Sequence, residues 1–325
     1  MKVLYIPIPT FSMHPWYDDF MAAVDGRYSV ELYDFDKPLA EQFQGIDVVV
    51  ELGGAVADRV MIDAGISAGV KLWQICGTGL DHVDVAYFLK KGVTLANTPG
   101  PFSSVALAEH VMFLMLYFSK KYNESLKNVR SQVFNQPMTE DLEGKTLGLV
   151  GFGASARELA RRAWPFEMKI LAIDVADVPQ EVCDEFHVGF LGGPQELDRL
   201  LAEADYLSLH IPLTSKTRHL IDGRAMGLMK PSAVLINVAR GGIVDETALI
   251  DALRSGRIQG AGLDVFTQEP LDLDNPLLQM ENVIVTPHNA GGSRGTSRKR
   301  GQACANNIHC IAQSLPPLHQ ITSVE

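Results

Sequence analysis

Three charged residues in the second half of the sequence are of types that can act together on one substrate. Arg240, Glu269 and His288 each follow closely after an apolar run that has the length of a buried strand. An arginine can hold a carboxylate in two parallel hydrogen bonds, and a histidine exchanges protons near neutral pH. A glutamate hydrogen-bonded to that histidine would raise its pKa. Each could be an ordinary surface residue, but as a set they suit hydride transfer at a carbon that bears a hydroxyl beside a carboxylate.

A glycine turn in the middle of the chain supplies the second component. Gly151-Phe152-Gly153-Ala154-Ser155-Ala156 follows the apolar run 146–150 and precedes a helical pattern. A strand, a glycine turn and a helix start in this order present free backbone N–H groups to a pyrophosphate. We therefore predict a dinucleotide site at Gly151, Gly153, Ala154 and Ser155.

The type of dinucleotide follows from the end of the next apolar run, 170–173. Asp174 stands there, where its carboxylate would accept hydrogen bonds from the adenine ribose and would repel a 2′-phosphate. Val175 and Ala176 offer no arginine that could hold such a phosphate. The sequence thus predicts NAD rather than NADP as cofactor.

Short apolar runs alternate with helical patterns along the whole chain, which predicts an α/β fold with parallel sheets. In the first hundred residues we expect strands at 3–8, 30–33, 48–52, 72–76 and 94–96, with helices at 16–24, 56–64 and 83–90. Turns such as Gly53-Gly54 and Gly77-Thr78-Gly79 follow these strands and are candidate substrate contacts, although a tight turn alone would also require glycine.

The second half predicts a complete dinucleotide-binding sheet of six strands, at 146–150, 170–174, 206–211, 234–238, 261–265 and 283–286, and a last helix at 296–312. Between the halves, Asn97-Thr98-Pro99-Gly100-Pro101 breaks regular structure, and a helix should run from Ser103 or Ser104 to Lys121. Residues 111–118 of that helix are apolar on every side, so we expect burial all round, between domains or at a subunit interface.

Composition narrows the class of protein. The 325 residues carry a net charge of -11, which argues against a nucleic-acid partner or an anionic membrane surface. The four cysteines have no metal-ligand spacing, so we expect reduced thiols and no metal. The chain begins directly with a strand pattern, and its most apolar stretch is far shorter than the ~20 residues that span a bilayer. A cytoplasmic protein is expected.

A series of motifs recurs in one order along nearly the whole chain: Gly77-Thr78-Gly79-Leu80-Asp81-His82-Val83-Asp84, Asn97-Thr98-Pro99-Gly100, Ala108-Glu109, the glycine turn with Asp174, His210-Ile211-Pro212-Leu213-Thr214, Asn237-Val238-Ala239-Arg240-Gly241-Gly242, Gly262-Leu263-Asp264-Val265-Phe266, Glu269-Pro270 and Thr286-Pro287-His288. In these motifs the sequence resembles the D-isomer-specific 2-hydroxyacid dehydrogenase family, with its phosphoglycerate dehydrogenases and glyoxylate or hydroxypyruvate reductases. The resemblance implies an NAD-dependent oxidoreductase that acts on a D-2-hydroxy acid or its 2-oxo acid.

The resemblance also implies an architecture. Two Rossmann-like doubly wound parallel-sheet domains are expected: a discontinuous substrate-binding domain at 1–98 plus 293–325, and an NAD-binding domain at 99–292. Members of the family are commonly dimers built around the helix expected at 103–121, so a homodimer is expected. The sequence stops soon after its last helix, so no appended regulatory domain is expected.

Residue roles follow from the same resemblance. Arg240 would bind the substrate carboxylate and carbonyl, His288 would be the acid/base, and Glu269 would orient and charge His288. Backbone groups of Thr78 and Gly79 would hold the carboxylate. The remaining cofactor contacts would come from a set of residues at strand ends: His210, Pro212, Thr217, Val238, Ala239 and Asp264.

Some features depart from the family or stay open. Ala156 replaces the third glycine of the turn, and Trp164-Pro165-Phe166 replaces a glycine; neither should impair function. An NAD-sensing, corepressor-like protein is the alternative function, and the formate dehydrogenase subgroup is disfavoured because its site lacks the Glu–His pair.

The identity of the acid is open. Arg59 could bind a phosphorylated acid, although its position favours a solvated helix arginine. Phe11, Trp16 and Phe102 could line an apolar pocket, although aromatic residues at such places more often belong to the core. The cluster Arg294, Arg298, Lys299 and Arg300 is either a solvated helix face or a contact for an anionic ligand.

Overall fold

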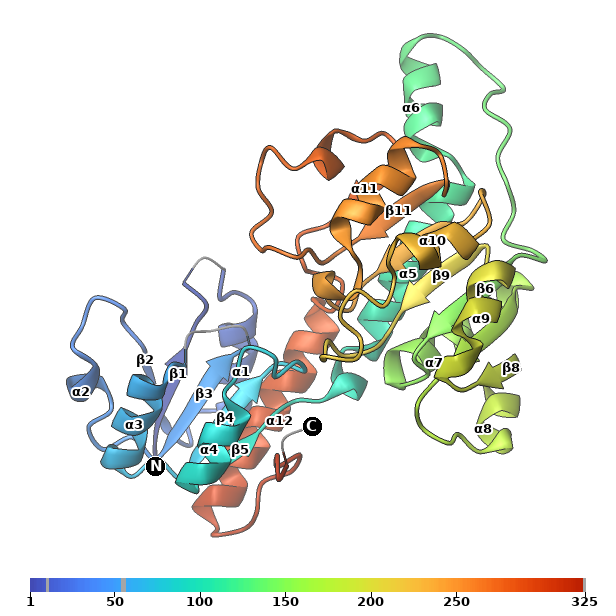
Figure 1. The fold of residues 1–325 in the computed structure, drawn as a ribbon. Coiled ribbons are helices and arrows are strands. Elements are labelled where there is room, and N and C mark those ends of the chain that lie inside the picture. The colour runs from blue at the N-terminus through green and yellow to red at the C-terminus, as the bar shows by residue number, and fades with distance from the viewer. Residues whose placement is uncertain (10–11, 54–56, 324–325) are drawn as a thin grey trace. The chain divides into compact units, whose positions relative to one another are not determined.

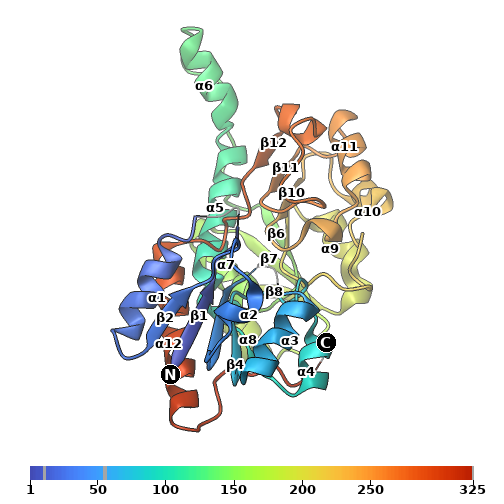
Figure 2. The same ribbon diagram turned by 90° about the vertical axis from the view of Figure 1, so that its left-hand side faces the viewer.

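The computed structural model describes residues 1–9, 12–53 and 57–323. The chain divides into two compact units, which we call the first unit (Met1–Phe102 with Gly292–Glu325) and the second unit (Ser103–Gly291). Each unit contains one parallel sheet with helices on both faces (Figures 1 and 2). Phe11, Gly54 and Val56, where predictions were made, lie outside the described residues. The division of the chain into a substrate-binding and an NAD-binding domain stays a prediction.

The first unit is built on a five-stranded sheet of order β2-β1-β3-β4-β5, in which every pair is parallel. The strands are β1 (Lys2–Ile6), β2 (Ser29–Leu32), β3 (Val48–Leu52), β4 (Leu72–Cys76) and β5 (Thr94–Ala96). The last three have the predicted bounds. β3 and β4 are buried along their whole length, and their sequences are accordingly mostly apolar, with Glu51 and Gln74 as buried polar residues.

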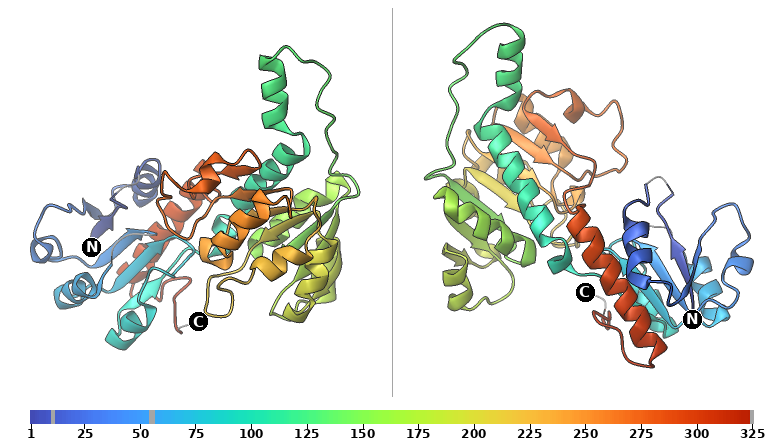
Figure 3. Two further views of the ribbon diagram at one scale, coloured as in Figure 1. Left: turned by 45° about the horizontal axis from the view of Figure 1, so that its top comes forward. Right: turned by 180° about the vertical axis from the view of Figure 1, so that it is seen from behind.

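Helices cover both faces of this sheet: α1 (Trp16–Val24), α2 (Leu39–Gln42), α3 (Arg59–Ala68), α4 (Val85–Lys91), α12 (Arg294–Ala312) and the short η1 (Gly100–Phe102). Phe20 of α1 and Ile308 of α12 belong to the core on one face, and Ile62 of α3 and Phe88 of α4 to the core on the other. The helix α12 lies against α1 and β4, as Figure 3 shows. Asp58 and Asp84 cap α3 and α4 by accepting backbone N–H groups.

The second unit is built on a parallel sheet of order β12-β11-β10-β9-β6-β7-β8. Its strands are β6 (Thr146–Val150), β7 (Lys169–Ile173), β8 (Val188–Gly192), β9 (Tyr206–Leu209), β10 (Val234–Asn237), β11 (Gly260–Leu263) and β12 (Val283–Val285). The prediction of six strands is wrong, because β8 adds a seventh at the edge. This strand is only partly buried and contains two glycines, so its sequence forms no apolar run.

The helices of the second unit are α5 (Ser104–Ser119), α6 (Tyr122–Arg130), α7 (Ala154–Ala163), α8 (Gln180–Glu185), α9 (Leu197–Glu203), α10 (Gly223–Leu228) and α11 (Glu246–Arg254), with short η2 (Trp164–Phe166), η3 (Pro194–Glu196), η4 (Gly241–Ile243) and η5 (Pro276–Gln279). Residues of α5, α7 and α8 share a core on one face of the sheet, and residues of α9, α10 and α11 share a core on the other.

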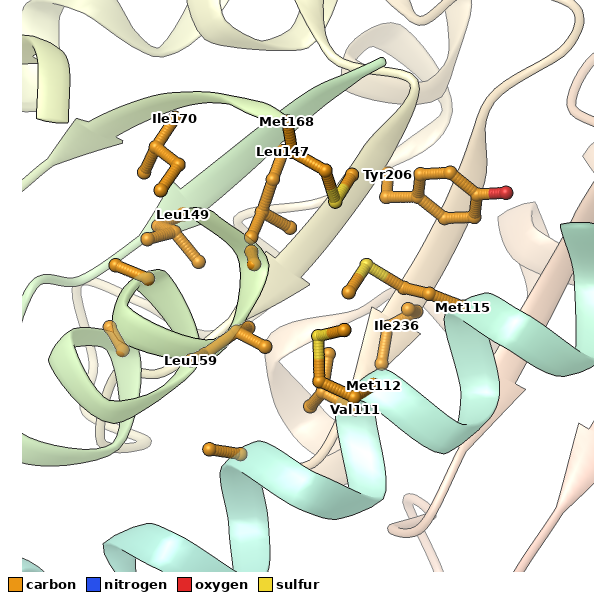
Figure 4. Close-up of a cluster of buried hydrophobic side chains, with 14 of the residues drawn as sticks. Val111, Met112, Met115, Leu147, Leu149, Leu159, Met168, Ile170, Tyr206 and Ile236 are labelled. Atoms are coloured by element: carbon orange, nitrogen blue, oxygen red, sulfur yellow. The ribbon is translucent and has the colours of Figure 1, made fainter. Parts of the chain in front are cut away.

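The helix α5 contributes one side to a core. Figure 4 shows Met112 and Met115 of α5 among side chains of the sheet, with Leu147 and Ile236 nearby. Burial of each such side chain contributes roughly 1.5–3 kcal/mol. Within this unit α5 is not buried on every side, because Phe113 is 48% exposed. Its burial between domains or at a subunit interface stays a prediction. None of the helices in the described ranges has both the length and the apolar character needed to cross a membrane.

Candidate active site

The glycine turn follows β6, the strand at which the order of the sheet reverses. From β6 the chain continues to β7 and β8 on one side of the sheet and then to β9, β10, β11 and β12 on the other. Ligands of open α/β sheets bind at this point, beyond the carboxyl ends of the strands. Gly151 has φ +90° there, and a Cβ at this residue would lie 2.7 Å from the carbonyl oxygen of His210. Only glycine therefore allows the turn after β6 to approach the turn after β9. At Gly153 an added Cβ would meet nothing within 4 Å, so this side of the turn is open.

The start of α7 offers hydrogen-bond donors. Gly153 is the N-cap residue and provides no side-chain cap. The N–H groups of Ala154 and Ser155 donate to no acceptor within the described residues. Free N–H groups at the positive end of a helix fit a pyrophosphate. Ala156, in place of the third glycine, is fully buried in the core between α7 and the sheet, so its methyl group contributes to packing there.

Asp174 is held next to this turn. Its Oδ2 accepts the N–H of Phe152 at 2.6 Å, and its Oδ1 accepts the N–H of Ala176 at 2.8 Å. Each carboxylate oxygen has a second lone pair. The side chain is therefore fixed in place and can still accept hydrogen bonds from the hydroxyls of a ribose.

His210 and its neighbours close the other side of the turn. Its Nδ1 lies 2.9 Å from Ser155 Oγ and its Nε2 lies 2.9 Å from Ser208 Oγ. Burial lowers the pKa of His210 to about 4, so the ring is neutral at physiological pH. The loop that follows is closed by Thr217 Oγ1, which donates to the carbonyl oxygen of Pro212 at 2.7 Å.

His288 and Glu269 are in direct contact at the carboxyl ends of β11 and β12. The distance between His288 Nδ1 and Glu269 Oε2 is 2.6 Å, and Glu269 Oε1 accepts the N–H of Phe266 at 2.9 Å. The hydrogen bond to Glu269 raises the pKa of His288 above its ordinary value, although partial burial opposes the shift. Burial favours a higher pKa for Glu269, but the hydrogen bonds from His288 and Phe266 outweigh it and lower that pKa.

Arg240 belongs to the same site. Its charge lowers the pKa of both Glu269 and His288, and its Nη1 donates to the carbonyl oxygen of Ala239 at 2.7 Å. Gly241 follows, and its backbone lies so close to the Phe266–Thr267 backbone that no side chain would fit. This approach sets the turn that carries Arg240 against the loop that carries Glu269.

Asp264 holds the loop of His288. It is 1% exposed, and its carboxylate accepts the Thr286 hydroxyl at 2.6 Å and the N–H groups of Asn289 and Ala290 at 2.9 and 2.8 Å. Its carbonyl oxygen accepts the N–H of His288, whose φ is +51°. Since a non-glycine residue rarely adopts this conformation, the loop depends on these bonds. A contact of Asp264 with the nicotinamide stays a prediction.

Three supporting residues were missed in the sequence. Thr286 Oγ1 donates to Asp264, so it must accept from His110 Nε2 on α5, 3.0 Å away. Burial lowers the pKa of His110, which keeps the ring neutral. Asn237, buried at the end of β10, accepts the N–H of Ala239 and donates to the carbonyl oxygen of Arg240, which positions the turn of Val238, Ala239 and Arg240. An asparagine at a strand end before a turn is a signal for such a role; His110 gives none.

In the first unit, the turn after β4 is anchored to residues that follow β5. Thr78 Oγ1 donates to the carbonyl oxygen of Thr98 at 3.1 Å, and Asn97 Nδ2 donates to that of Thr78 at 3.0 Å. The N–H groups of Thr78 and Gly79 donate to no acceptor in the described part of the chain. A Cβ at Gly53 would lie 3.0 Å from the Cα of Gly77, which accounts for both glycines by packing alone.

Other candidates of the first unit have structural partners. Arg59 forms an ion pair with Asp84, at 2.6 Å, on the neighbouring helix. Phe102 packs edge-on against His319, and Trp16 packs beside the core under α1. The four cysteines are free, and within the described residues no group of three or more potential ligands could hold a metal.

The doubly wound sheet, the glycine turn and Asp174 place the second unit in the class of dinucleotide-binding α/β units. Residues 112–290 match the sequence profile described as D-isomer specific 2-hydroxyacid dehydrogenase, NAD binding domain. The chain belongs to the D-isomer specific 2-hydroxyacid dehydrogenase family, whose members are NAD-dependent dehydrogenases and reductases, and its cofactor is NAD.

Three known proteins illustrate the relationship. The chain is 35% identical over 272 residues to a D-3-phosphoglycerate dehydrogenase of Methanocaldococcus jannaschii, covering 83% of this chain and 50% of that one. It is 37% identical over 263 residues to a hydroxypyruvate reductase of Thermotoga maritima, covering 78% and 81%. The NAD-complexed D-isomer specific 2-hydroxyacid dehydrogenase of Lactobacillus delbrueckii ssp. bulgaricus aligns with a TM-score of 0.80 at 27% identity, covering 99% and 100%. The chain thus spans only half the length of the first relative.

Proposed function

We propose that this protein transfers a hydride reversibly between NAD(H) and the second carbon of a D-2-hydroxy acid or its 2-oxo acid. The contact of His288 with Glu269, beside Arg240 and in the unit that binds NAD, carries the proposal. Two relatives support the substrate class by name, a D-3-phosphoglycerate dehydrogenase and a hydroxypyruvate reductase.

Each residue of the site has a separate role in the proposed reaction. Bound NAD(H) supplies or accepts the hydride. The Arg240 guanidinium holds the carboxylate and the 2-oxo oxygen of the acid in its planar fork. His288 Nδ1 is engaged by Glu269, so its Nε2 gives a proton to the 2-oxo oxygen in reduction and takes it back in oxidation. Glu269 stabilises the imidazolium form of His288.

The remaining predicted contacts complete the proposal. The N–H groups of Thr78 and Gly79 bind the substrate carboxylate, and the first unit is the substrate-binding domain. The second unit binds NAD through the glycine turn, Asp174 and the turns that follow β9, β10 and β11.

We further propose that the protein is a homodimer. The rings of His110, Phe113 and Tyr117 on α5 form a continuous row with that of Tyr122 at the start of α6. Phe113 and Tyr122 are 48% and 53% exposed. The segment after α6 exposes Phe134 and Met138 by 73% and 81%. Exposed apolar side chains gathered in this way mark a surface for a partner, and the helix α5 is the one for which the sequence predicts a subunit contact.

The function can be tested by following NADH oxidation with a panel of 2-oxo acids: glyoxylate, pyruvate, hydroxypyruvate and phosphohydroxypyruvate. We expect turnover with at least one of them. NADH binding without turnover of any acid would instead support the corepressor-like alternative.

His288→Ala tests the proton transfer. We expect turnover to fall by ~10²–10⁴ because the acid/base group is lost, while NADH binding, measured by fluorescence, stays close to that of the wild type. His309→Ala, on the exposed side of α12, is the control and should retain full turnover. Full turnover of His288→Ala would disprove the assignment.

A further inference from the structure

One face of α5 lies along β11 in the second unit. A Cβ at Gly262 would lie 3.1 Å from Leu114 Cδ1, and a Cβ at Gly260 would lie 2.6 Å from Phe118 Cε1. The two glycines thus allow the helix to approach the strand closely. His110 shares this face of α5 because it lies one helical turn before Leu114. The helix therefore places His110 towards the carboxyl end of β11.

The loop that carries His288 begins at this end of the strand, and we call residues 286–290 the catalytic loop. The N–H of Thr286 donates to the carbonyl oxygen of Leu263, the last residue of β11, at 2.9 Å. Thr286 Oγ1 lies 3.0 Å from His110 Nε2. The helix and the loop are therefore joined by a hydrogen bond between two side chains that are 176 positions apart in the sequence.

The direction of this hydrogen bond follows from the carboxylate next to it. Asp264 can only accept, so Thr286 gives its one hydroxyl proton to Asp264 Oδ1, 2.6 Å away. Towards His110 the hydroxyl is then an acceptor, and the ring must donate its Nε2–H. Burial lowers the pKa of His110, so the ring donates as a neutral imidazole. The His110 N–H thus holds the hydroxyl in the orientation that serves Asp264.

Asp264 in turn determines the conformation of the catalytic loop. Its carboxylate accepts the N–H groups of Asn289 and Ala290 at 2.9 and 2.8 Å, and its carbonyl oxygen accepts the N–H of His288 at 2.9 Å. His288 has a φ of +51°, which a non-glycine residue rarely adopts without support. A displacement of Asp264 would therefore reach the acid/base group directly.

We propose that His110 is a positioning residue for the reaction: its hydrogen bond to Thr286 holds Asp264 and the catalytic loop in the required geometry. His110 itself contacts neither substrate nor cofactor. The inference rests on the proposed function, since it needs His288 as the acid/base group, and it extends the site to a helix that carries none of the predicted site residues. Such a role matters because a displacement of about 1 Å at a reacting group can reduce turnover by roughly 100-fold.

His110→Leu removes the N–H and keeps a side chain that can pack at the same place. We expect kcat for NADH-dependent reduction to fall roughly 10–100-fold while KM for the acid changes by less than about threefold. KM should hold because Arg240 is positioned separately, by Asn237. ADP-ribose, the part of NAD assigned to the glycine turn and Asp174, should bind with wild-type affinity. The control is His309→Leu, the same substitution at an exposed histidine of α12, which should retain the wild-type kcat.

Two amide variants test the hydrogen bond itself. In His110→Gln the side-chain amide can place an N–H close to the position of Nε2, so this variant should retain most of the kcat. In His110→Asn the same amide sits on a shorter side chain that does not reach Thr286, so kcat should fall as in His110→Leu. If His110→Leu does not fold, the comparison of these two variants decides.

Thr286→Val tests the path of the effect. It removes the hydroxyl and keeps the shape of the side chain, so kcat should fall at least as far as in His110→Leu. The double variant should lose no more than Thr286→Val alone, because His110 acts only through this hydroxyl. Losses that multiply in the double variant would overturn the inference.

Other outcomes would contradict the role of His110 as well. These are a wild-type kcat in His110→Leu, equal kcat in the glutamine and asparagine variants, or a loss of ADP-ribose binding that parallels the loss of kcat. The last of these would show that His110 only supports the fold. Absence of turnover with every acid in the wild type would contradict the proposed function itself, whereas wild-type turnover in His110→Leu contradicts only the positioning role.

Discussion

At the scale of single residues, the contact between His288 and Glu269 decides which proton can move. With Nδ1 facing the carboxylate at 2.6 Å, only Nε2 of the imidazole can reach a substrate oxygen. Arg240 opposes the shift that Glu269 causes, because its positive charge lowers the pKa of His288. The net result is a raised pKa, so the protonated form of His288 persists to higher pH than in a free histidine.

This shift predicts the pH dependence of both directions. Reduction of a 2-oxo acid needs protonated His288, so its kcat/KM should be constant at low pH and fall as pH rises through the raised pKa. Oxidation of the hydroxy acid needs the neutral ring and should rise over the same range. Glu269→Gln removes the charge that raises this pKa, so both profiles should move to lower pH.

Steady-state rates from pH 5 to 10 check this prediction. At pH values above the pKa of His288 in both proteins, the reductive kcat/KM of Glu269→Gln should be lower than that of the wild type. The difference should be roughly tenfold for each pH unit by which the substitution lowers that pKa. Glu281→Gln, an exposed neighbour before β12, is the control and should keep the wild-type profile. Profiles of Glu269→Gln that coincide with the wild type would remove Glu269 from this role.

Residue types at strand ends could be predicted, and the network behind them could not. Arg240, Glu269 and His288 each follow an apolar run, and parallel strands bring such ends to one edge. Asp264 was identified as a site residue only through the resemblance to the family. His110 precedes Thr286 by 176 positions and meets it only because α5 packs across the sheet, and no local pattern in the sequence encodes that contact.

At the scale of elements, α5 has two different sides. One side, with Met112 and Met115, belongs to the core of the second unit (Figure 4). The other carries the aromatic row that continues to Tyr122 on α6. A helix that is apolar all round but exposed on one side in a single chain is in keeping with a second copy covering that side.

A charge on this side should separate the proposed dimer. Phe113→Asp removes an exposed aromatic side chain and places a carboxylate at the proposed contact, which should weaken association by at least ~2 kcal/mol if Phe113 is central. Size-exclusion chromatography with light scattering should show a dimer for the wild type and a monomer for the variant. Val60→Asp, at a 68% exposed apolar position of α3, is the control. A wild-type monomer, or a Phe113→Asp dimer of unchanged affinity, would contradict the proposal.

Elements were predictable where burial is complete. Five elements have the predicted bounds because their residues are mostly apolar or show a clear helical period: β3, β4, β5, β6 and α1. The edge strand β8 was not predicted because Gly189 and Gly192 interrupt its apolar pattern. The start of α3 at Arg59 follows from the cap of Asp58 rather than from hydrophobicity.

At the scale of the whole molecule, the described residues form four hydrophobic cores, two on each sheet. A change inside one sheet should therefore alter the unfolding of its own unit first. The second unit should be stabilised by NAD through mass action, about 2.7 kcal/mol at a hundredfold excess over Kd.

The first unit contains a buried carboxyl group whose titration should affect the stability of this unit. Glu51 of β3 is fully buried in the core with Phe43 and Phe88. Its Oε2 accepts Trp73 Nε1–H at 2.7 Å, and its Oε1 has no hydrogen-bond partner within the described residues. Burial raises the pKa of Glu51 to about 7, and the bond from Trp73 opposes the shift. The carboxyl is therefore protonated in the folded chain at mildly acid pH.

The stability of the first unit should consequently fall as pH rises from about 4.5 to about 7, where the unfolded chain loses its proton before the folded one does. Below that range, Glu51 is protonated in both the folded and the unfolded state and does not change the free energy of unfolding. Above it, the free energy of unfolding of the unit is lower by roughly 3 kcal/mol. Glu51→Gln keeps an acceptor for Trp73 without a charge, so it should remove this dependence and raise the melting temperature at pH 8. Scanning calorimetry from pH 4.5 to 8 measures the difference, and Glu41→Gln, exposed on α2, should match the wild type. If the melting temperatures of wild type and Glu51→Gln changed with pH in the same way, Glu51 would not be the cause of the pH dependence of this unit's stability.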